Sequence, residues 1–461
     1  MTVEGELPPP LGPGLTAGPV GRTLARLTGP MLVGHVAVVA FNLTDTYFVS
    51  RLGTTALAAM GFTFPVVMFV GSLAVGLGVG AASVISRAIG RGDPSAVREL
   101  TTHALILSLL IVAAFVAAGL LTIRPLFRLM GAEGETLALV EQYMRIWYVG
   151  MVFLVVPMVG NAAIRATGDT LSPGAIMVLA NVLNLGLDPL LIFGLWGLPR
   201  MGIAGAAVAT VLARASALVG ALAILHFRKR MLSFERPTLR RLWDSWRALL
   251  YVGVPSAGAI VLTPISQSIF TKLASWFGPA TVAAVGAAGR VETFAMMVII
   301  PLASVLVPFI GQNWGAGRFG RARLAQKGSS LFALAWGLGM LVLLGALARP
   351  IGRLFSDDPH VVGQIALYLR LVPIGYGMMG VAILAGAAMN AINRPLHSVA
   401  LSAVRVLGLC APLAVAGAWW LGVGGLFGAI AVANLLAGCL ALPWARRLLA
   451  APVPRAGGEE V

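Results

Sequence analysis

The run ALILSLLIVAAFVAAGLL, from Ala104 to Leu121, decides the fold class of this chain. It carries no charged residue, and as a helix it is about 27 Å long, which nearly spans the hydrocarbon core of a bilayer. A second such run, LFALAWGLGMLVLLGAL, extends from Leu331 to Leu347. Neither run alternates apolar and polar residues as the strands of a membrane β-barrel do. Because a spanning segment must satisfy its own backbone hydrogen bonds, both runs predict α-helices.

The whole chain has the composition of a polytopic membrane protein. Of its 461 residues, 58% are hydrophobic and 11% are charged, whereas a soluble chain carries about a quarter charged residues. We therefore expect an all-α membrane protein with about 12 transmembrane helices. The expected helices cover residues 24–48, 55–86, 97–122, 137–160, 172–197, 202–226, 247–275, 281–311, 324–347, 362–388, 397–421 and 424–447.

The basic residues indicate how the chain crosses the membrane. The net charge is +16, and Lys and Arg gather in the connections near residues 87–98, 226–247 and 318–327. These are even-numbered loops, and in membrane proteins the cytoplasmic loops are the ones enriched in Lys and Arg. We therefore predict a multi-pass protein of the inner (plasma) membrane with both termini in the cytoplasm. The positive charge reports topology here and does not indicate nucleic-acid binding.

The chain contains an internal repeat in which matching motifs keep one constant offset. Gly53 matches Gly278, and at the same offset RPLFRL at Arg124 matches RPIGRL at Arg349 and YMRI at Tyr143 matches YLRL at Tyr368. Six expected helices separate each pair, so we expect two pseudo-symmetric six-helix bundles with a central cavity between the halves. The predicted organisation is a disordered N-terminus (1–23), a first bundle (24–226), a cytoplasmic linker (227–246), a second bundle (247–447) and a disordered tail (448–461).

Two carboxylates, Asp45 and Asp188, lie inside expected helices, and the equivalent positions of the second half hold Phe270 and Leu413 instead. A charged group within the bilayer costs a few kcal/mol or more, so it usually faces a polar partner or a wet cavity. On the fifth expected helix Asp188 shares a face with two asparagines, and on the first Asp45 shares a face with a third. A buried carboxylate beside a second one favours its protonated form, so we predict a proton-binding site in the first half. The three asparagines are Asn181, Asn184 and Asn42.

Further residues are assigned to this site by their depth. Tyr143 and Thr210, like the two aspartates, lie within about 15 Å of the outer helix ends. We also assign Asn161 to the substrate cavity or its polar network. Structural roles stay open for several of these residues: Asp45 as a helix cap, Asp188 bonded only to a neighbour, and the asparagines as hydrogen bonds between helices.

The remaining polar residues suggest structural roles. Arg290 and Glu292 are expected to form an ion pair near the outer interface of the second half, and Arg214 is expected to extend towards the interface as Lys272 does. Cys410 and Cys439 have neither metal-type spacing nor a disulfide pattern, and read as small core residues. No metal site is expected, although a sodium ion at Asp45 and Asp188 is an alternative to a proton.

Four stretches together resemble the multidrug and toxic compound extrusion (MATE) family. They are GPMLVGHVAVVAFNLTDTYFVSRLGTTALAAMG from Gly29, SRAIGRGD from Ser86, NAAIRATGDT from Asn161 and NVLNLGLDPLLIFGLWGLPRMGIAGAAVAT from Asn181. The resemblance is greatest to the archaeal and DinF-like branch, and implies a MATE/MOP-type fold. It also implies proton coupling at Asp45, a bend of the first helix at Pro30, and a polar network of Tyr143, Asn184, Asp188 and Thr210.

The resemblance further implies a function. We expect secondary active export of organic cations or amphipathic drugs in exchange for protons or Na⁺, by a monomer that alternates access across the bilayer and needs no cofactor besides the coupling ion. A lipid-linked precursor flippase of the same superfamily is the alternative, although few Arg or Lys residues lie at mid-depth to bind a pyrophosphate. An enzyme is not expected, because neither a catalytic cluster nor a GxxxxGK[ST] nucleotide loop occurs.

Overall fold

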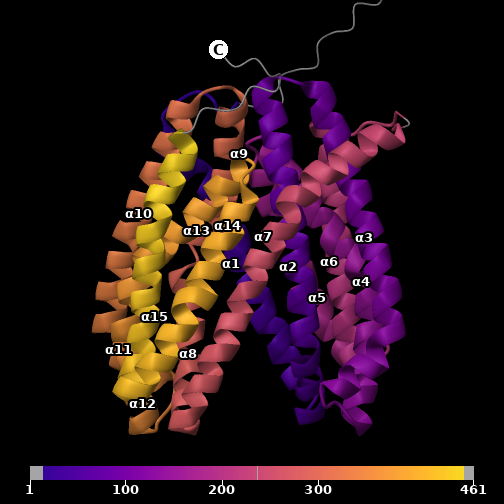
Figure 1. The fold of residues 1–461 in the computed structure, drawn as a ribbon. Helices are drawn as coiled ribbons and strands as arrows, with labels where there is room; N and C mark the ends of the chain where they lie inside the picture. Colours follow the sequence, from indigo (N-terminus) through magenta and orange to yellow (C-terminus); the bar gives the residue numbers. More distant parts are fainter. Residues whose placement is uncertain (1–13, 236, 451–461) are drawn as a thin grey trace, which may run out of the picture. The chain divides into compact units, whose positions relative to one another are not determined.

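The computed structural model describes residues 14–235 and 237–450, and the regular structure in these ranges is entirely helical (Figure 1). The first half contains α1 (Val20–Ser50), α2 (Thr54–Arg91), α3 (Pro94–Leu129), α4 (Gly134–Ala166), α5 (Leu171–Phe193), η1 (Leu195–Gly197), α6 (Ile203–Ala223) and η2 (Ile224–Arg228). The second half contains α7 (Leu239–Ala274), η3 (Ser275–Phe277), α8 (Pro279–Ala295), α9 (Ile299–Gly315), α10 (Phe319–Ala346), α11 (Ala348–Phe355), α12 (Pro359–Leu371), η4 (Val372–Gly375), α13 (Tyr376–Ala391), α14 (Pro395–Ala403), η5 (Val404–Cys410) and α15 (Ala411–Ala450).

These helices confirm the predicted fold class. In the described chain, ten helices are long and apolar enough to cross a membrane, and α8 with α9 gives an eleventh, bent by 43°. The stretch Pro395–Ala450 has 56 residues, too many for one crossing of a core about 30 Å thick. Non-helical backbone at Gly422 divides it, which gives the last two expected helices.

Two expected helices are interrupted where proline removes a backbone donor. Pro301 cannot bond to the carbonyl of Met297, and the expected helix 281–311 breaks into α8 and α9 just before it. Pro373 lies in η4, a 3₁₀ segment that joins α12 to α13 within the expected helix 362–388. Elsewhere helix starts follow familiar rules: Asp93 caps α3 by accepting a hydrogen bond from the Ala96 N–H at 2.9 Å.

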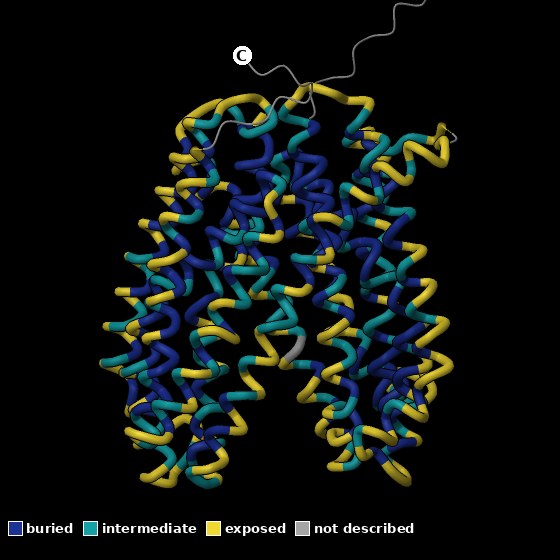
Figure 2. Tube along the Cα trace, in the orientation of Figure 1, coloured by how far each residue is buried: buried dark blue, intermediate teal, exposed yellow. Residues whose placement is uncertain are grey.

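Burial follows the pattern expected of helices in lipid (Figure 2). Along α3 the small and aliphatic residues that face other helices are buried, whereas Leu121 is 83% exposed. Large apolar side chains on the outer surface are stable there because lipid tails, not water, surround them. The chain is therefore a multi-pass membrane protein.

Two compact units divide the chain, and their borders do not follow the sequence halves. One unit contains the described residues up to Val261 together with residues 307–316, and the other contains residues 262–306 and those from Gly317 onward. As a result α7 and α9 each contribute to both units. We refer to the first as the N-unit and to the second as the C-unit.

The backbone carries the same internal repeat as the sequence. Positive φ angles recur in pairs that keep the repeat offset: Gly53 (111°) and Gly278 (97°), Gly92 (72°) and Gly317 (70°), Gly168 (89°) and Asn393 (64°), Gly197 (83°) and Gly422 (62°). Asn is the non-glycine residue best suited to this conformation. The helix ends of the two halves are thus built alike.

The predicted disordered ends are tested only in part. Residues 1–13 and 451–461 lie outside the described residues. The predicted disorder up to residue 23 is wrong for its last part, since α1 begins at Val20 and Leu15 is already buried. The predicted linker 227–246 also overlaps α7, which begins at Leu239.

Candidate functional site

Two buried carboxylates lie on α1 and α5, which pack against each other in the N-unit. Asp45 is 9% exposed and Asp188 is fully buried. The side-chain amide of Asn184, one turn earlier on α5, donates a hydrogen bond of 3.3 Å to Oδ1 of Asp188. Within the described residues, Oδ1 of Asp45 and Oδ2 of Asp188 have no hydrogen-bond partner. Since buried acceptors are nearly always satisfied, these two atoms are suited to take up a proton or a cation.

Tyr143 of α4 is the group that unites this cluster. Its buried side chain interacts electrostatically with both Asp45 and Asp188, and the two aspartates interact with each other. Asn181 lies one turn before Asn184 on α5, and its amide nitrogen is also buried without a partner in the described chain. The structure thus brings together four of the residues predicted for the coupling site and its network, and Asn181 lies on the same helix.

Arg214 of α6 joins the cluster instead of extending to the interface. Its guanidinium carbon lies 5.6 Å from the centre of the Phe41 ring on α1, and its charge interacts with Tyr143 on α4. A side chain that reaches both α1 and α4 points into the bundle. The predicted extension of Arg214 towards the interface is therefore wrong.

Two other predicted residues, among those described, lie elsewhere or make no hydrogen bond to the carboxylates. Asn161 is about 27 Å from Tyr143 along α4, so it belongs to the opposite end of the bundle. Thr210 is half-buried on α6, and among the described contacts it has no hydrogen bond to either aspartate. The side chain of Asn42 lies outside the described ones. Pro30 lies where α1 touches α5: a Cβ added at Gly174 would be 2.7 Å from the Pro30 carbonyl oxygen.

The predicted ion pair of Arg290 with Glu292 does not form. Glu292, on α8 of the C-unit, accepts hydrogen bonds from the hydroxyls of Tyr368 (3.0 Å) and Tyr376 (3.4 Å), while Arg290 is exposed. Residues two apart on a helix point about 200° apart, so these side chains cannot face the same partner. The charge that interacts with Glu292 belongs to Arg405 of η5.

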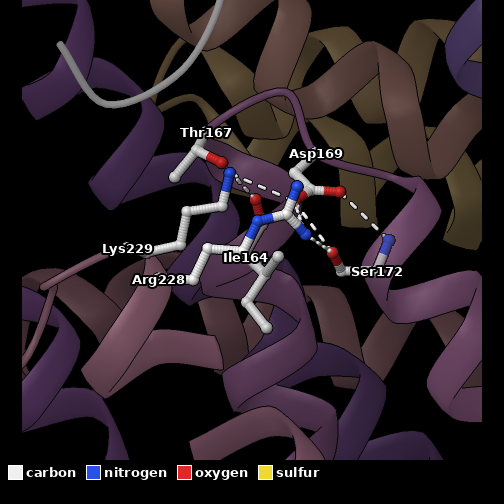
Figure 3. Close-up of polar contacts among 6 residues, drawn as sticks. All are labelled: Ile164, Thr167, Asp169, Ser172, Arg228 and Lys229. Atoms are coloured by element: carbon white, nitrogen blue, oxygen red, sulfur yellow. Dashed lines mark hydrogen bonds and ion pairs between the residues drawn. The ribbon is translucent and has the colours of Figure 1, made fainter. Parts of the chain in front are cut away.

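A second polar cluster surrounds Asp169 in the turn between α4 and α5 (Figure 3). The Asp169 carboxylate accepts hydrogen bonds from the Ser172 N–H (3.0 Å) and hydroxyl (2.9 Å), and pairs with Lys229 at 3.1 Å. Arg228 donates to the Ser172 hydroxyl at 2.9 Å. Burial alone would raise the pKa of Asp169, but the hydrogen bonds from Ser172 and the Lys229 ammonium bring that pKa below its usual value. The cluster fastens the α4–α5 turn to the end of η2.

A third cluster joins the end of α9 to the start of the chain. The Gln312 side chain accepts a hydrogen bond from the Leu15 N–H (2.9 Å) and donates one to the Ala166 carbonyl (2.6 Å). The Asn313 amide donates to the Leu15 carbonyl at 3.1 Å. Both Gln312 and Asn313 are fully or almost fully buried. Two side chains from the second half therefore hold the segment before α1.

The same end of α9 crosses the end of α2 at very close range. A Cβ added at Gly90 would be 2.2 Å from the Gln312 carbonyl oxygen, and one added at Gly315 would be 2.3 Å from the Arg87 carbonyl oxygen. Gly90 and Gly315 are equivalent positions of the internal repeat. The crossing is thus built from matching positions of the two halves, both of which must lack a side chain.

The comparisons with known proteins agree with this architecture. The MatE family model matches two segments, residues 30–190 and 255–416, whose starts keep the same offset as Gly53 and Gly278. The chain is a member of the MATE family. The double match also places the repeat where the sequence and the backbone angles indicate it.

Relatives of this MATE protein carry different functional names. The chain is 38% identical to the "FAD transporter" of Shewanella oneidensis over 94% of this chain and 96% of that protein. It is 30% identical to the "Probable multidrug resistance protein NorM" of Deinococcus radiodurans over 90% and 93% of the two chains. The solved structure of the Vibrio cholerae MATE transporter VcmN in its bent form has a TM-score of 0.89 at 31% identity, covering 93% and 97% of the chains.

These comparisons support the family but not the archaeal and DinF-like branch that the motifs predicted, since the relative at 38% identity is a bacterial FAD transporter. Sequence reasoning also missed Arg214, Asp169 and Gln312 as members of polar clusters. Asp169 stands inside the quoted stretch NAAIRATGDT and could have been found there. Gln312 contacts residues that are far away in the sequence, at positions 15 and 166, which no local pattern reveals.

Proposed function

We propose that this MATE protein is a secondary exporter in which a proton binds the Asp45–Asp188 pair and drives the outward release of an amphipathic organic substrate. The observation that carries the proposal is the pair of buried carboxylate oxygens, one on Asp45 and one on Asp188, without a partner in the described chain. A protonated carboxyl adds a donor and removes a buried charge, so proton uptake changes what α1 and α5 can contact.

Pro30 supplies a place for α1 to respond. Its missing N–H leaves the Arg26 carbonyl without its helical partner, and α1 meets α5 closely at this point. In the proposed cycle, protonation of Asp45 weakens its attraction to polar groups, α1 bends at Pro30 and the substrate leaves; loss of the proton on the other side restores the straight helix.

Efflux from proteoliposomes under an imposed pH gradient tests the coupling. Asp45→Asn and Asp188→Asn should each abolish proton-driven efflux, because an amide cannot exchange the proton. Asp357→Asn, which changes an exposed carboxylate, serves as the matched control and should retain wild-type efflux. Full proton-driven efflux by Asp45→Asn would refute the proposal. Replacing the pH gradient with a Na⁺ gradient decides between proton and sodium.

A flavin dinucleotide is the second candidate substrate, because the relative at 38% identity is named an FAD transporter. The same vesicles should therefore be loaded in parallel with FAD and with a fluorescent cationic dye. Efflux of FAD alone would favour the flavin candidate, and efflux of the dye would favour multidrug export. If neither moves, the lipid-linked precursor flippase becomes the leading alternative.

The proposed orientation has both termini in the cytoplasm of an inner membrane, as the distribution of Lys and Arg predicts. Single cysteines at exposed Arg318 and exposed Arg51 should then be labelled from opposite sides of intact cells. Labelling of both from the same side would contradict this topology.

A further inference from the structure

Arg214 carries a charge at a depth of the membrane where a charge costs free energy. It lies near the midpoint of α6 (Ile203–Ala223), about 16 Å from the start of the helix and therefore near the middle of the span. A guanidinium is always charged, and a charge at this depth is costly unless it has a partner or a function. In the described part of the chain, Arg214 takes part in no ion pair.

The surroundings of Arg214 are aromatic. Its guanidinium lies over the Phe41 ring at 5.6 Å, and it interacts electrostatically with Tyr143. Tyr143 in turn interacts with Asp45 and Asp188. The tyrosine is thus the group shared between a fixed positive charge and two carboxylates.

The positions of Phe41 and Arg214 along their helices fix the side of the site on which Arg214 lies. Phe41 lies one turn before Asp45, closer to the N-terminal end of α1. Arg214 follows Thr210 by one turn towards the C-terminal end of α6. These two helix ends lie on the same side of the membrane, because an odd number of connections joins α1 to α6. With cytoplasmic termini, Arg214 therefore lies on the inner side of the carboxylates.

We infer that Arg214 is an electrostatic barrier on the inner side of the carboxylates, which the coupling cation passes only when the helices rearrange during the transport cycle. A fixed positive charge in a low-dielectric interior repels cations, and a single arginine can exclude protons from a pore in this way. A proton that reaches Asp45 from outside then passes to the inner side only together with this rearrangement, so its energy is not lost as a leak. The inference rests on the proposed proton coupling and adds to it the residue that keeps the coupling tight.

The chain offers a matched control for this role. Arg51 makes the same kind of contact, with its guanidinium 5.9 Å from the centre of the Tyr47 ring, but it lies at the exposed end of α1. If the cation–π contact alone matters, loss of either arginine has a similar effect. If a charge at this depth of the bundle matters, only Arg214 is required.

The test is the proton flux into sealed proteoliposomes without substrate, followed with an internal pH-sensitive dye after an acid jump outside. We expect Arg214→Gln to raise this flux at least about tenfold over wild type, while Arg214→Lys, which keeps the charge, and Arg51→Gln stay at the wild-type level. Size-exclusion chromatography and thermal unfolding establish that each variant is folded.

Three outcomes would overturn the inference. Wild-type flux in a folded Arg214→Gln variant shows that no barrier was removed. An equal increase in Arg214→Lys shows that shape and not charge is responsible, and an equal increase in Arg51→Gln shows that the position is not special. The proposed function is tested separately by wild-type efflux: if the wild type exports by a proton gradient and Arg214→Gln does not leak, only the barrier is refuted.

Discussion

The bond network of Gln312 makes a prediction that can be measured at a single backbone amide. Replacing Gln312 with Ala removes the acceptor of the Leu15 N–H and the donor to the Ala166 carbonyl, both of which are buried. A buried polar group left without a partner costs about 1–3 kcal/mol. The attachment of the segment before α1 should therefore weaken by about 2 kcal/mol or more.

Native-state hydrogen exchange, read by mass spectrometry on a peptide that contains Leu15, is the direct assay. A loss of about 2 kcal/mol corresponds to roughly 30-fold faster exchange of this amide in Gln312→Ala. Gln326→Ala is the matched control, because Gln326 is buried in α10 and its amide donates to Ser330 of the same helix, at 3.2 Å. It should leave the Leu15 amide unchanged.

The reasoning is refuted if exchange in Gln312→Ala rises by less than about threefold, which is under about 0.7 kcal/mol. An equal rise in both glutamine variants would also refute it, because the effect would then be a general loss of stability.

Three further predictions concern other parts of the chain. Asp188→Asn should raise the thermal midpoint while proton-driven efflux is lost, because it removes a buried charge whose Oδ2 lacks a partner among the described residues. The pKa of Asp169 is lowered by folding, so its carboxylate stabilises the protein only while it is ionised, and this stabilisation is lost as the pH falls through about 4 and below. Asp169→Asn should therefore reduce the loss of stability in acid. The thermal unfolding midpoint, measured as a function of pH for wild type and variant, checks this. Gly315→Ala should cost about 1–3 kcal/mol or more through overlap with the Arg87 carbonyl, whereas Gly320→Ala, with nothing within 4 Å, should be neutral or slightly stabilising. Thermal unfolding of the two glycine variants, each compared with wild type, measures these stability changes.

The two buried carboxylates of the candidate site could be predicted because their signal is local. Asp45 and Asp188 are charges in apolar runs, and Asn184 lies one turn from Asp188, so helical spacing alone places the amide beside the carboxylate. The constant offset of the internal repeat could also be found from the sequence alone, since each repeated motif is short and contiguous. What periodicity could not supply is the direction of a side chain relative to other helices.

Arg214 and Glu292 illustrate that limit. An arginine in the middle of α6 can reach the interface or turn inward, and only the positions of α1 and α4 show that it turns inward. The partners of Glu292 are Tyr368 and Tyr376, far away in the sequence, so the nearby Arg290 was a misleading choice. Helical geometry already argued against that pair, because two residues apart is the wrong spacing.

The membership of residues 307–316 in the N-unit has a consequence for the origin of such a chain. A free-standing first half would lack the helix end that covers Gly90 and satisfies Leu15 and Ala166. An ancestral half-length protein could have formed this crossing as a symmetric dimer, in which the end of a helix in one copy crosses the matching helix end of the second copy. Gene fusion would then have preserved the crossing, and separately expressed halves should be soluble in detergent only when produced together.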